Sequence, residues 1–346
     1  MLTFYNEHHA QHRGRYEMFR GEQVPCFEKP ERADRVLAEF ERRGLGQIVT
    51  PHGASLVSLE RIHSPRYLHF LRTAWSEWTA LDPANAARDA FPSMWPIRGM
   101  RADIEPDNFA AKVGLYSYDA GSPFTSGTWV AARAGAHCAL SAAQQLVLGD
   151  RASFALSRPP GHHAGMDFFG GYCFLNNAAL AAQHLRNAGM KKVAVLDVDY
   201  HHGNGTQAIF YDRPDVFFAS LHGDPRTEYP FYLGHADEKG QGAGLGANLN
   251  LPLPRGTNYA TWAQALDTAL AAIQTFGAEA LVVSLGMDTF EGDPISGFTL
   301  KSDDYLRLGA RLAKAGLPTA FVFEGGYAVE AVGINAVNVL QGFTGD

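Results

Sequence analysis

The sequence contains few cysteines, and their spacing excludes two common uses of this residue. Cys26, Cys138 and Cys173 are the only three, and they lie far apart along the chain. They form neither the close pairs of a zinc-binding module nor the dense set of a disulfide-stabilised secreted domain. We therefore expect a reducing compartment, the cytoplasm, and three small buried thiols.

The chain also lacks the features that direct proteins to membranes or nucleic acids. No basic stretch with a long apolar run opens the sequence, and no apolar run is long enough to span a bilayer. The formal net charge is −7 and lysines and arginines form no cluster, which argues against nucleic-acid binding. With 46% hydrophobic residues, the composition is that of a soluble enzyme, predicted here as a single domain over 1–346.

Short apolar runs alternate with longer helical patterns in the second half of the chain. The apolar runs cover 153–156, 193–198, 216–221, 280–285 and 319–323. The helical patterns cover 174–187, 259–276 and 302–315, and Gly189 and Gly277 follow the first two as stop signals. Apolar runs of this kind are typical of strands buried on both faces. Their order predicts an α/β fold with an open, mostly parallel sheet and helices on both faces.

The first half of the chain is less regular. Residues 30–43 predict a helix, with proline at its start and Gly44 at its end. The segment 81–124 is rich in Pro, Asp, Asn, Trp and Arg and has no clear period. A segment this long without regular structure usually serves function or assembly, so we expect an insert here.

The densest polar motif follows the apolar run 193–198. Asp197, Asp199 and His201 alternate along the end of this predicted strand, and residues two apart in a strand point the same way. They should project together at the carboxyl end of the sheet, where open α/β folds bind ligands. Carboxylate and imidazole ligands this close suit a divalent metal such as zinc. A polar strand end followed by a helix cap is the alternative interpretation.

Three further motifs follow other predicted strands. His162 and His163 are adjacent in a loop framed by prolines and glycines, where each imidazole can act as a base, an acid or an electrostatic donor. Asp288 is well placed as the third ligand of an open catalytic metal site. Tyr327 follows two glycines, and its hydroxyl can donate to a developing oxyanion. Taken alone, this last motif is an ordinary turn.

Together these motifs resemble the histone deacetylase and acetylpolyamine amidohydrolase family, whose arginase–deacetylase fold has an eight-stranded sheet with the active site at the strand carboxyl ends. The resemblance covers nearly the whole chain and is densest over 153–327, including Ser220–His222. The segment 27–32 is also similar to the family. The insert at 81–124 resembles the acetylpolyamine amidohydrolase branch, in which it helps form a dimer and narrows the site entrance.

The resemblance implies two metal sites. It assigns a catalytic zinc ion to Asp199, His201 and Asp288, and iron(II) is an alternative for the same nitrogen and oxygen ligands. It also implies a structural potassium or sodium ion near the catalytic metal, held by Asp197, Asp199, His201, Ser220 and Leu221. This second ion would tune the electrostatic field around the first.

The resemblance also implies roles for the histidine pair. His163 is the expected general base and then acid, and His162 is its electrostatic partner, oriented by Asp197. Tyr327 is the expected donor to the tetrahedral oxyanion. Asn204 stands where some deacetylases carry an aspartate that orients the second histidine. Because an amide is neutral, it raises the imidazole pKa less than a carboxylate does, so we expect a neutral His163.

Four further residues are expected around the substrate by the same resemblance. Tyr172 and Tyr229 should form the walls of a narrow aromatic channel, with Ile295 lining the site nearby. Ordinary packing is the alternative for both tyrosines. Glu105, in the insert, is expected at the channel mouth as a partner for a distal ammonium, and a solvated surface glutamate is the alternative.

The predicted reaction is therefore removal of an acetyl group from a small cationic primary amine, such as acetylputrescine or acetylcadaverine. A protein or peptide acetyl-lysine deacetylase, or an enzyme preferring other acyl groups, is the alternative with the same chemistry. An inactive acyl-amine binding protein fits less well, because Tyr327 and all three metal ligands are present. A dimanganese enzyme of the arginase type also fits less well, because it would need more metal carboxylates and would leave Tyr327 without a role. The expected assembly is a homodimer.

Overall fold

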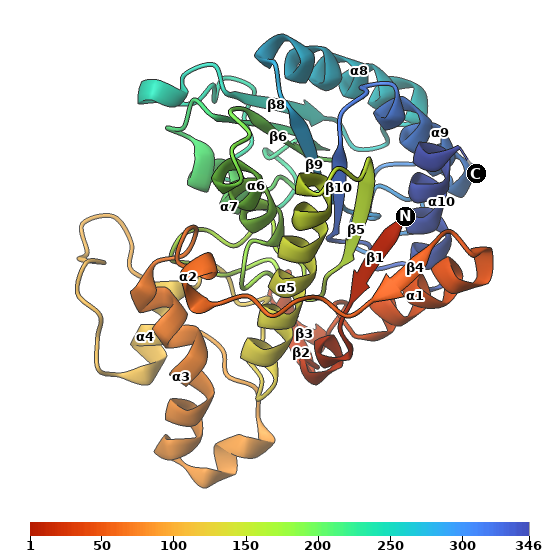
Figure 1. The fold of residues 1–346 in the computed structure, drawn as a ribbon. Coiled ribbons are helices and arrows are strands. Elements are labelled where there is room, and N and C mark those ends of the chain that lie inside the picture. The colour runs from red at the N-terminus through yellow and green to blue at the C-terminus, as the bar shows by residue number, and fades with distance from the viewer. Residues whose placement is uncertain (346) are drawn as a thin grey trace.

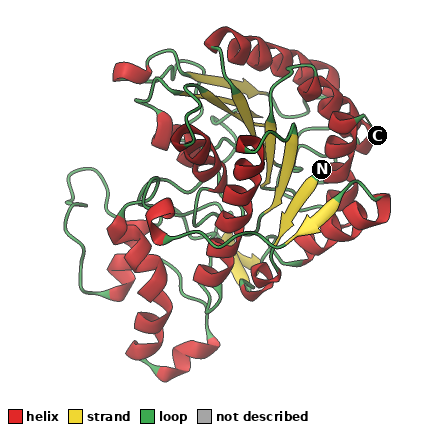
Figure 2. Ribbon diagram, viewed as in Figure 1, coloured by secondary structure: helices red, strands yellow, loops and turns green. Residues whose placement is uncertain are grey.

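Eight parallel strands form the centre of the computed structural model, which describes residues 1–345 (Figures 1 and 2). Across the sheet their order is β4-β1-β5-β10-β9-β6-β7-β8. The strands are β1 (Leu2–Tyr5), β4 (Gln47–Val49), β5 (Ala152–Leu156), β6 (Val193–Asp197), β7 (Val216–Gly223), β8 (Asn248–Leu253), β9 (Ala280–Leu285) and β10 (Thr319–Phe323). Every neighbouring pair is parallel, which confirms the predicted open α/β architecture.

Helices cover both faces of this sheet, as the sequence predicted. Each central strand contributes alternate residues to two separate hydrophobic cores, as the pleat requires. The first core holds residues of α2 (Leu56–Leu59), α3 (Pro65–Leu81), α4 (Phe109–Tyr116), α5 (Thr128–Val147), α6 (Asn177–Asn187) and α7 (Asn204–Phe210). The second core holds residues of α1 (Glu31–Arg43), α8 (Tyr259–Phe276), α9 (Ser302–Ala313) and α10 (Val329–Thr344).

The predicted helix ends differ slightly from the observed ones for local reasons. The helix expected from residue 174 starts at Asn177, because the Asn176 side chain caps it by accepting a hydrogen bond from the Ala179 amide. Gly44 and Gly277 end α1 and α8 in the left-handed conformation, as their positions predicted. No helix within residues 1–345 combines the length and apolar character that a membrane span needs.

The insert at 81–124 is more regular than its sequence suggested. It contains a 3-10 turn, Pro83–Ala87, and the helix α4, which Asn108 caps through its side chain. Phe109, Val113 and Tyr116 of α4 face the first core. In Figure 1 the insert lies with α3 at the lower left, outside the layers that cover the sheet.

A two-stranded antiparallel hairpin, β2 (Tyr16–Phe19) and β3 (Glu22–Pro25), lies outside the main sheet. The β2 strand is held to the rest of the molecule by the Met18 amide, which donates to the Ala120 carbonyl at 3.3 Å. This hairpin had no signal in the sequence analysis, and it becomes one wall of the site described below.

A buried ion pair ties the N-terminal segment to the loop after β5. The Arg158 guanidinium contacts both Glu28 oxygens at 2.7 and 2.8 Å and donates to the carbonyls of His9 and His12 at 2.6 and 2.7 Å. Arg158 is fully buried and Glu28 nearly so. These four hydrogen bonds use four of the five N–H donors of the guanidinium inside the protein.

Replacing Arg158 by Ala is expected to lower the free energy of unfolding by about 3–5 kcal/mol, because it removes one of the two guanidinium groups that pair with the buried Glu28 carboxylate, the other being that of Arg32 at 2.9 Å. Urea denaturation measures this change. The control is Arg311→Ala, which removes an exposed ion pair with Asp267 and should cost less than about 1 kcal/mol. If both variants lost the same free energy of unfolding, the result would contradict the structural role of the buried pair.

Candidate active site

The candidate site lies at the carboxyl ends of four adjacent strands. In the sheet, β5, β10, β9 and β6 are consecutive neighbours, so the loops that follow them meet at one edge. The loop after β5 carries His162 and His163, and the loop after β6 carries Asp199 and His201. The loops after β9 and β10 carry Asp288 and Tyr327. Parallel pairing thus brings together residues that are far apart along the chain.

Asp199, His201 and Asp288 form the one group within the described chain whose ligand atoms all lie within 4.8 Å of one another. The Nδ1 atom of His201 is 2.9 Å from Asp288 Oδ2 and 3.4 Å from Asp199 Oδ1. Both carboxylates are fully buried. Burial, followed by the charge of Asp199, raises the pKa of Asp288, because two adjacent buried carboxylates destabilise each other without a cation between them.

This group fits a catalytic divalent metal. Three protein ligands of mixed nitrogen and oxygen type leave a coordination position open, as in catalytic zinc sites. Backbone amides orient the two carboxylates: Gly325 N donates to Asp199 at 2.9 Å and Tyr200 N donates to Asp288 at 2.7 Å. A Cβ at Gly325 would come within 2.6 Å of both carboxylates, so only glycine leaves this space beside the ligands.

The two histidines of the pair have different partners. The Nδ1 atom of His162 is 2.9 Å from Asp197 Oδ2, and the Nδ1 atom of His163 is 2.6 Å from Asn204 Oδ1. The two rings are tilted against each other, with centroids 4.0 Å apart. The structure therefore brings both imidazoles, Asp197 and Asn204 together as the sequence predicted.

The surroundings push the pKa values of this pair apart. Burial lowers the pKa of His162, but the carboxylates of Asp197 and Asp199 outweigh burial and raise this pKa to about 10. Burial lowers the pKa of His163 well below its usual value, and the nearby His162 and His201 lower it further. The surroundings therefore favour the charged form of His162 and the neutral form of His163. Two titratable groups separated in this way mark acid and base roles.

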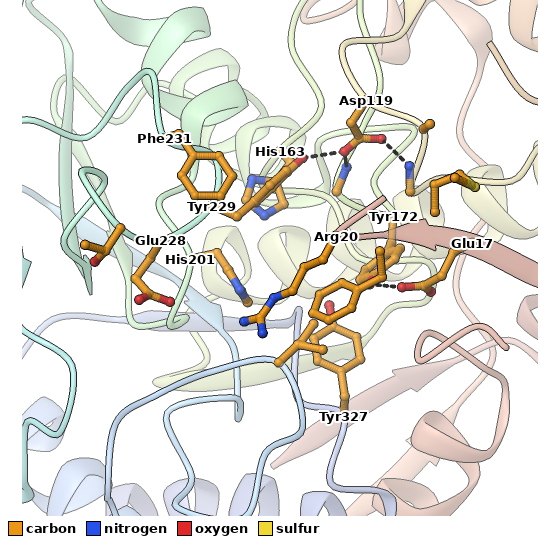
Figure 3. A pocket seen from close by; sticks show the side chains of 17 residues that line it. Glu17, Arg20, Asp119, His163, Tyr172, His201, Glu228, Tyr229, Phe231 and Tyr327 are labelled. Carbon is orange, nitrogen blue, oxygen red and sulfur yellow. Dashed lines mark hydrogen bonds between the residues drawn. The ribbon is translucent and has the colours of Figure 1, made fainter. Parts of the chain in front are cut away.

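A cavity of about 280 Å³ opens above these groups, and Figure 3 shows its lining side chains. His163, His201 and Tyr327 lie among the lining residues, together with the predicted Tyr172, Tyr229 and Ile295. Tyr172 stands edge-on to Tyr327 at 5.4 Å, and Tyr229 stands edge-on to His163 at 5.2 Å. The two tyrosines therefore face the reactive groups from different directions.

The aromatic walls are held by carboxylates that the sequence analysis did not find. Tyr172 donates through its hydroxyl to Glu17 at 2.7 Å, and Tyr229 donates to Asp119 at 2.5 Å. Asp119 also accepts from the Gly171 amide at 2.7 Å. Glu17 and Asp119 come from the hairpin and from the insert, and no motif around them signalled a role.

Glu324 is a further residue whose place was not predicted. Its Oε2 atom accepts from the backbone amides of Gly161 and His162 at 2.5 and 3.2 Å, which fixes the histidine loop against the end of β10. Burial raises the pKa of this carboxyl group to about 7. Its only signal in the sequence was its position next to the Gly-Gly-Tyr motif.

Two groups of predicted residues lie away from the cavity. Glu105 does not line it: this residue accepts from the Tyr116 hydroxyl and pairs with Lys112 Nζ at 3.3 Å. Ser220 and Leu221 are fully buried in β7, where Ser220 is in register with Asp197 of β6. Ser220 Oγ is 2.8 Å from His222 Nδ1. The structural potassium or sodium ion remains a prediction.

A neutral imidazole, a nearby charged imidazole and a phenol beside a metal-binding group can together deliver water to a carbonyl carbon. The fold and the site thus define a hydrolase. The histone deacetylase domain model matches residues 26–343. The chain therefore belongs to the histone deacetylase family, and it is a hydrolase that acts on amides.

Relatives match over the whole length of the chain. It is 55% identical over 345 residues to acetylpolyamine amidohydrolase 2 of Pseudomonas aeruginosa, covering 100% of this chain and 99% of that one. It is 47% identical to the acetylpolyamine amidohydrolase of Mycoplana ramosa, with 100% of both chains covered. A crystal structure of acetylpolyamine aminohydrolase from Burkholderia pseudomallei superposes with a TM-score of 0.94 at 40% identity, covering 99% of this chain and 98% of that chain.

Proposed function

We propose that this enzyme is a zinc-dependent deacetylase of small acetylated polyamines, with acetylputrescine and acetylcadaverine as substrates. The observation that carries the proposal is the narrow cavity of about 280 Å³ with aromatic walls above the Asp199–His201–Asp288 group. A cavity of this size accommodates the alkyl chain of a small acetylated amine. The names of the full-length relatives support the same substrate class.

Asp199, His201 and Asp288 would hold the metal, and iron(II) suits these ligands as zinc does. When bound, the metal polarises the amide carbonyl and activates the attacking water.

The histidine pair would transfer the proton. His163 directs Nδ1 to the Asn204 carbonyl oxygen, so that Nδ1 carries the hydrogen and Nε2 is free to accept a proton from water. The same nitrogen then returns this proton to the leaving amine. His162 stays charged beside Asp197 and stabilises the negative charge that develops on the substrate oxygen.

Tyr327 would donate its hydroxyl to that oxygen. Its backbone amide donates to Asp293 at 2.7 Å, and the Arg32 guanidinium stacks on its ring at 4.7 Å. Arg32 is itself held by hydrogen bonds to the carbonyls of Gly326 and Glu324. The phenol is thus positioned before substrate arrives, as electrostatic stabilisation requires.

The substrate class is tested by kcat/KM on acetylputrescine, acetylcadaverine and an acetyl-lysine peptide with zinc-reconstituted protein. We expect the two acetylated diamines to be hydrolysed at least about tenfold more efficiently than the peptide, a difference of ~1.4 kcal/mol in transition-state binding. Preference for the peptide would favour the protein deacetylase alternative. Binding of all three without hydrolysis would favour an inactive acyl-amine binding protein.

The insert is proposed to form a homodimer interface. Between residues 81 and 104 it exposes six large apolar side chains, those of Leu81, Met94, Trp95, Ile97, Met100 and Ile104. Neighbouring exposed apolar residues of this kind mark interaction surfaces. Contact between two inserts would also shape the entrance, and would place Glu105 of each chain near that contact.

We expect sedimentation analysis to give a dimer mass for the wild type and a monomer mass for the double variant Ile97→Asp, Met100→Asp, because charges oppose burial of the patch. The control variant Leu148→Asp changes a residue that is 69% exposed at the end of α5 and should stay dimeric. A monomeric wild type well above micromolar concentration would refute the interface.

A further inference from the structure

Arg20 is the cationic side chain that the mechanism leaves unused at the cavity. It lies at the tip of the hairpin, between β2 and β3, and lines the cavity together with His163, His201 and Tyr327. Figure 3 shows its side chain extending across the cavity, in this view between His201 and Tyr327. Its position makes it a candidate to contact the end of a bound substrate that lies away from the reacting amide.

The backbone at Arg20 shows that this position is unusual. Arg20 and Gly21 have φ values of +52° and +86°, as in the two-residue turns that favour Asn-Gly. A long side chain at the first position is disfavoured there, because its Cβ crowds the following carbonyl. A residue kept in such a conformation at a site wall points to a role in that site.

The hairpin holds Arg20 firmly against the cavity. Glu17 of β2 accepts from the Tyr172 hydroxyl at 2.7 Å and from the Phe27 amide at 3.0 Å. The Met18 amide adds the bond to Ala120. These bonds tie β2 to the aromatic wall formed by Tyr172, and Arg20 lies two residues beyond Met18, at the tip beside the cavity.

Arg20 has no acidic partner among the described residues. Its guanidinium stacks on the Phe19 ring at 5.0 Å. The three carboxylates that line the cavity are engaged elsewhere: Glu17 with Tyr172, Asp119 with Tyr229, and Glu228 with Arg255 Nη1 at 3.0 and 3.1 Å. The guanidinium therefore keeps its donors free for a ligand.

We infer that Arg20 is a specificity-determining residue, which lets the enzyme bind acetylated amines whose far end carries a carboxylate in addition to the acetylated diamines. A guanidinium pairs with a carboxylate through two parallel hydrogen bonds, and it repels a cation at the same place. This inference rests on the proposed deacetylase function. It extends the substrate range from acetylated diamines to ω-acetamido acids.

The test compares three substrates with the same alkyl chain: 6-acetamidohexanoate, N-acetylhexylamine and acetylcadaverine. Arg20→Gln should lower kcat/KM about tenfold for the carboxylate substrate, raise it about threefold for acetylcadaverine, and change it less than about twofold for the neutral substrate. Arg20→Glu should raise the ratio of kcat/KM for acetylcadaverine to kcat/KM for the carboxylate substrate more than Arg20→Gln does. The control Arg61→Gln removes an exposed arginine that does not line the cavity. This variant should keep the wild-type kcat/KM for all three substrates.

An equal change of kcat/KM for all three substrates would overturn the inference, because it would show that Arg20 acts only on the shape or stability of the hairpin. The same would follow if added salt, which screens exposed charges, did not reduce the difference between the charged substrates. Dissociation constants of three hydroxamates with the same far ends provide a readout without turnover. If no acetylated amine is hydrolysed, the proposed function fails, and the hydroxamate ratios still decide the role of Arg20.

Discussion

Asp288→Asn is expected to abolish both metal binding and hydrolysis. Asp288 is fully buried, and its Oδ2 atom lies 2.9 Å from His201 Nδ1. The amide is isosteric and can still accept from the Tyr200 amide, but it lacks the charge that a divalent cation needs. We expect the metal content to fall from about one ion per chain to a small fraction. Loss of kcat/KM should exceed about 100-fold, because changing even the groups that support metal ligands costs about 10–100-fold.

Metal content by elemental analysis and kcat/KM on acetylcadaverine measure the two effects. Asp267→Asn, on the exposed surface of α8, is the matched control and should keep both at the wild-type level. Circular dichroism should show the same fold in all three proteins. Full activity of Asp288→Asn with normal metal content would remove this residue from the metal site.

Tyr327→Phe is expected to retain the fold and the metal while losing most of its turnover. The substitution removes one hydroxyl and keeps the ring that packs against Tyr172 and under Arg32. If the hydroxyl donates to the oxyanion, its loss should lower kcat by about 10²–10³-fold, as for other donors of this type. The KM should change little, because this hydrogen bond is made mainly in the transition state.

Steady-state kinetics with zinc-reconstituted protein distinguish these parameters. Tyr232→Phe is the control: this tyrosine is 90% exposed and does not line the cavity, so its kcat should remain unchanged. A Tyr327→Phe variant with wild-type kcat would exclude the oxyanion role. A large rise in KM alone would indicate instead that the hydroxyl contributes to ground-state binding.

The predictable part of this molecule is the part where one physical requirement dominates the local sequence. Strands buried on both faces must be apolar, so β5, β6, β7, β9 and β10 were visible as short apolar runs. Polar residues directly after such runs must lie at the carboxyl edge of a parallel sheet. That rule alone placed Asp199, His201, Asp288 and the histidine pair together, as the structure has them.

Other elements follow requirements that a single sequence does not display. The helix α5 is rich in alanine and buried along most of its length, so it has no amphipathic period to detect. The strand β8 lies at the sheet edge and alternates Asn248 and Asn250 with leucines, because both asparagines donate to Gln207. Glu17, Arg20 and Asp119 enter the site from the hairpin and the insert, and only the three-dimensional structure brings them near the histidines.

The strand order also bears on how this enzyme folds. The central strand β10 pairs with β5 and β9, although about half of the chain separates the start of β5 from the end of β10. Contacts of such sequence separation close large loops before any compensating interaction forms, which slows folding. No local fragment contains a complete set of metal ligands and proton donors. A nascent or partly refolded chain is therefore expected to have no activity before β5, β10, β9 and β6 have paired.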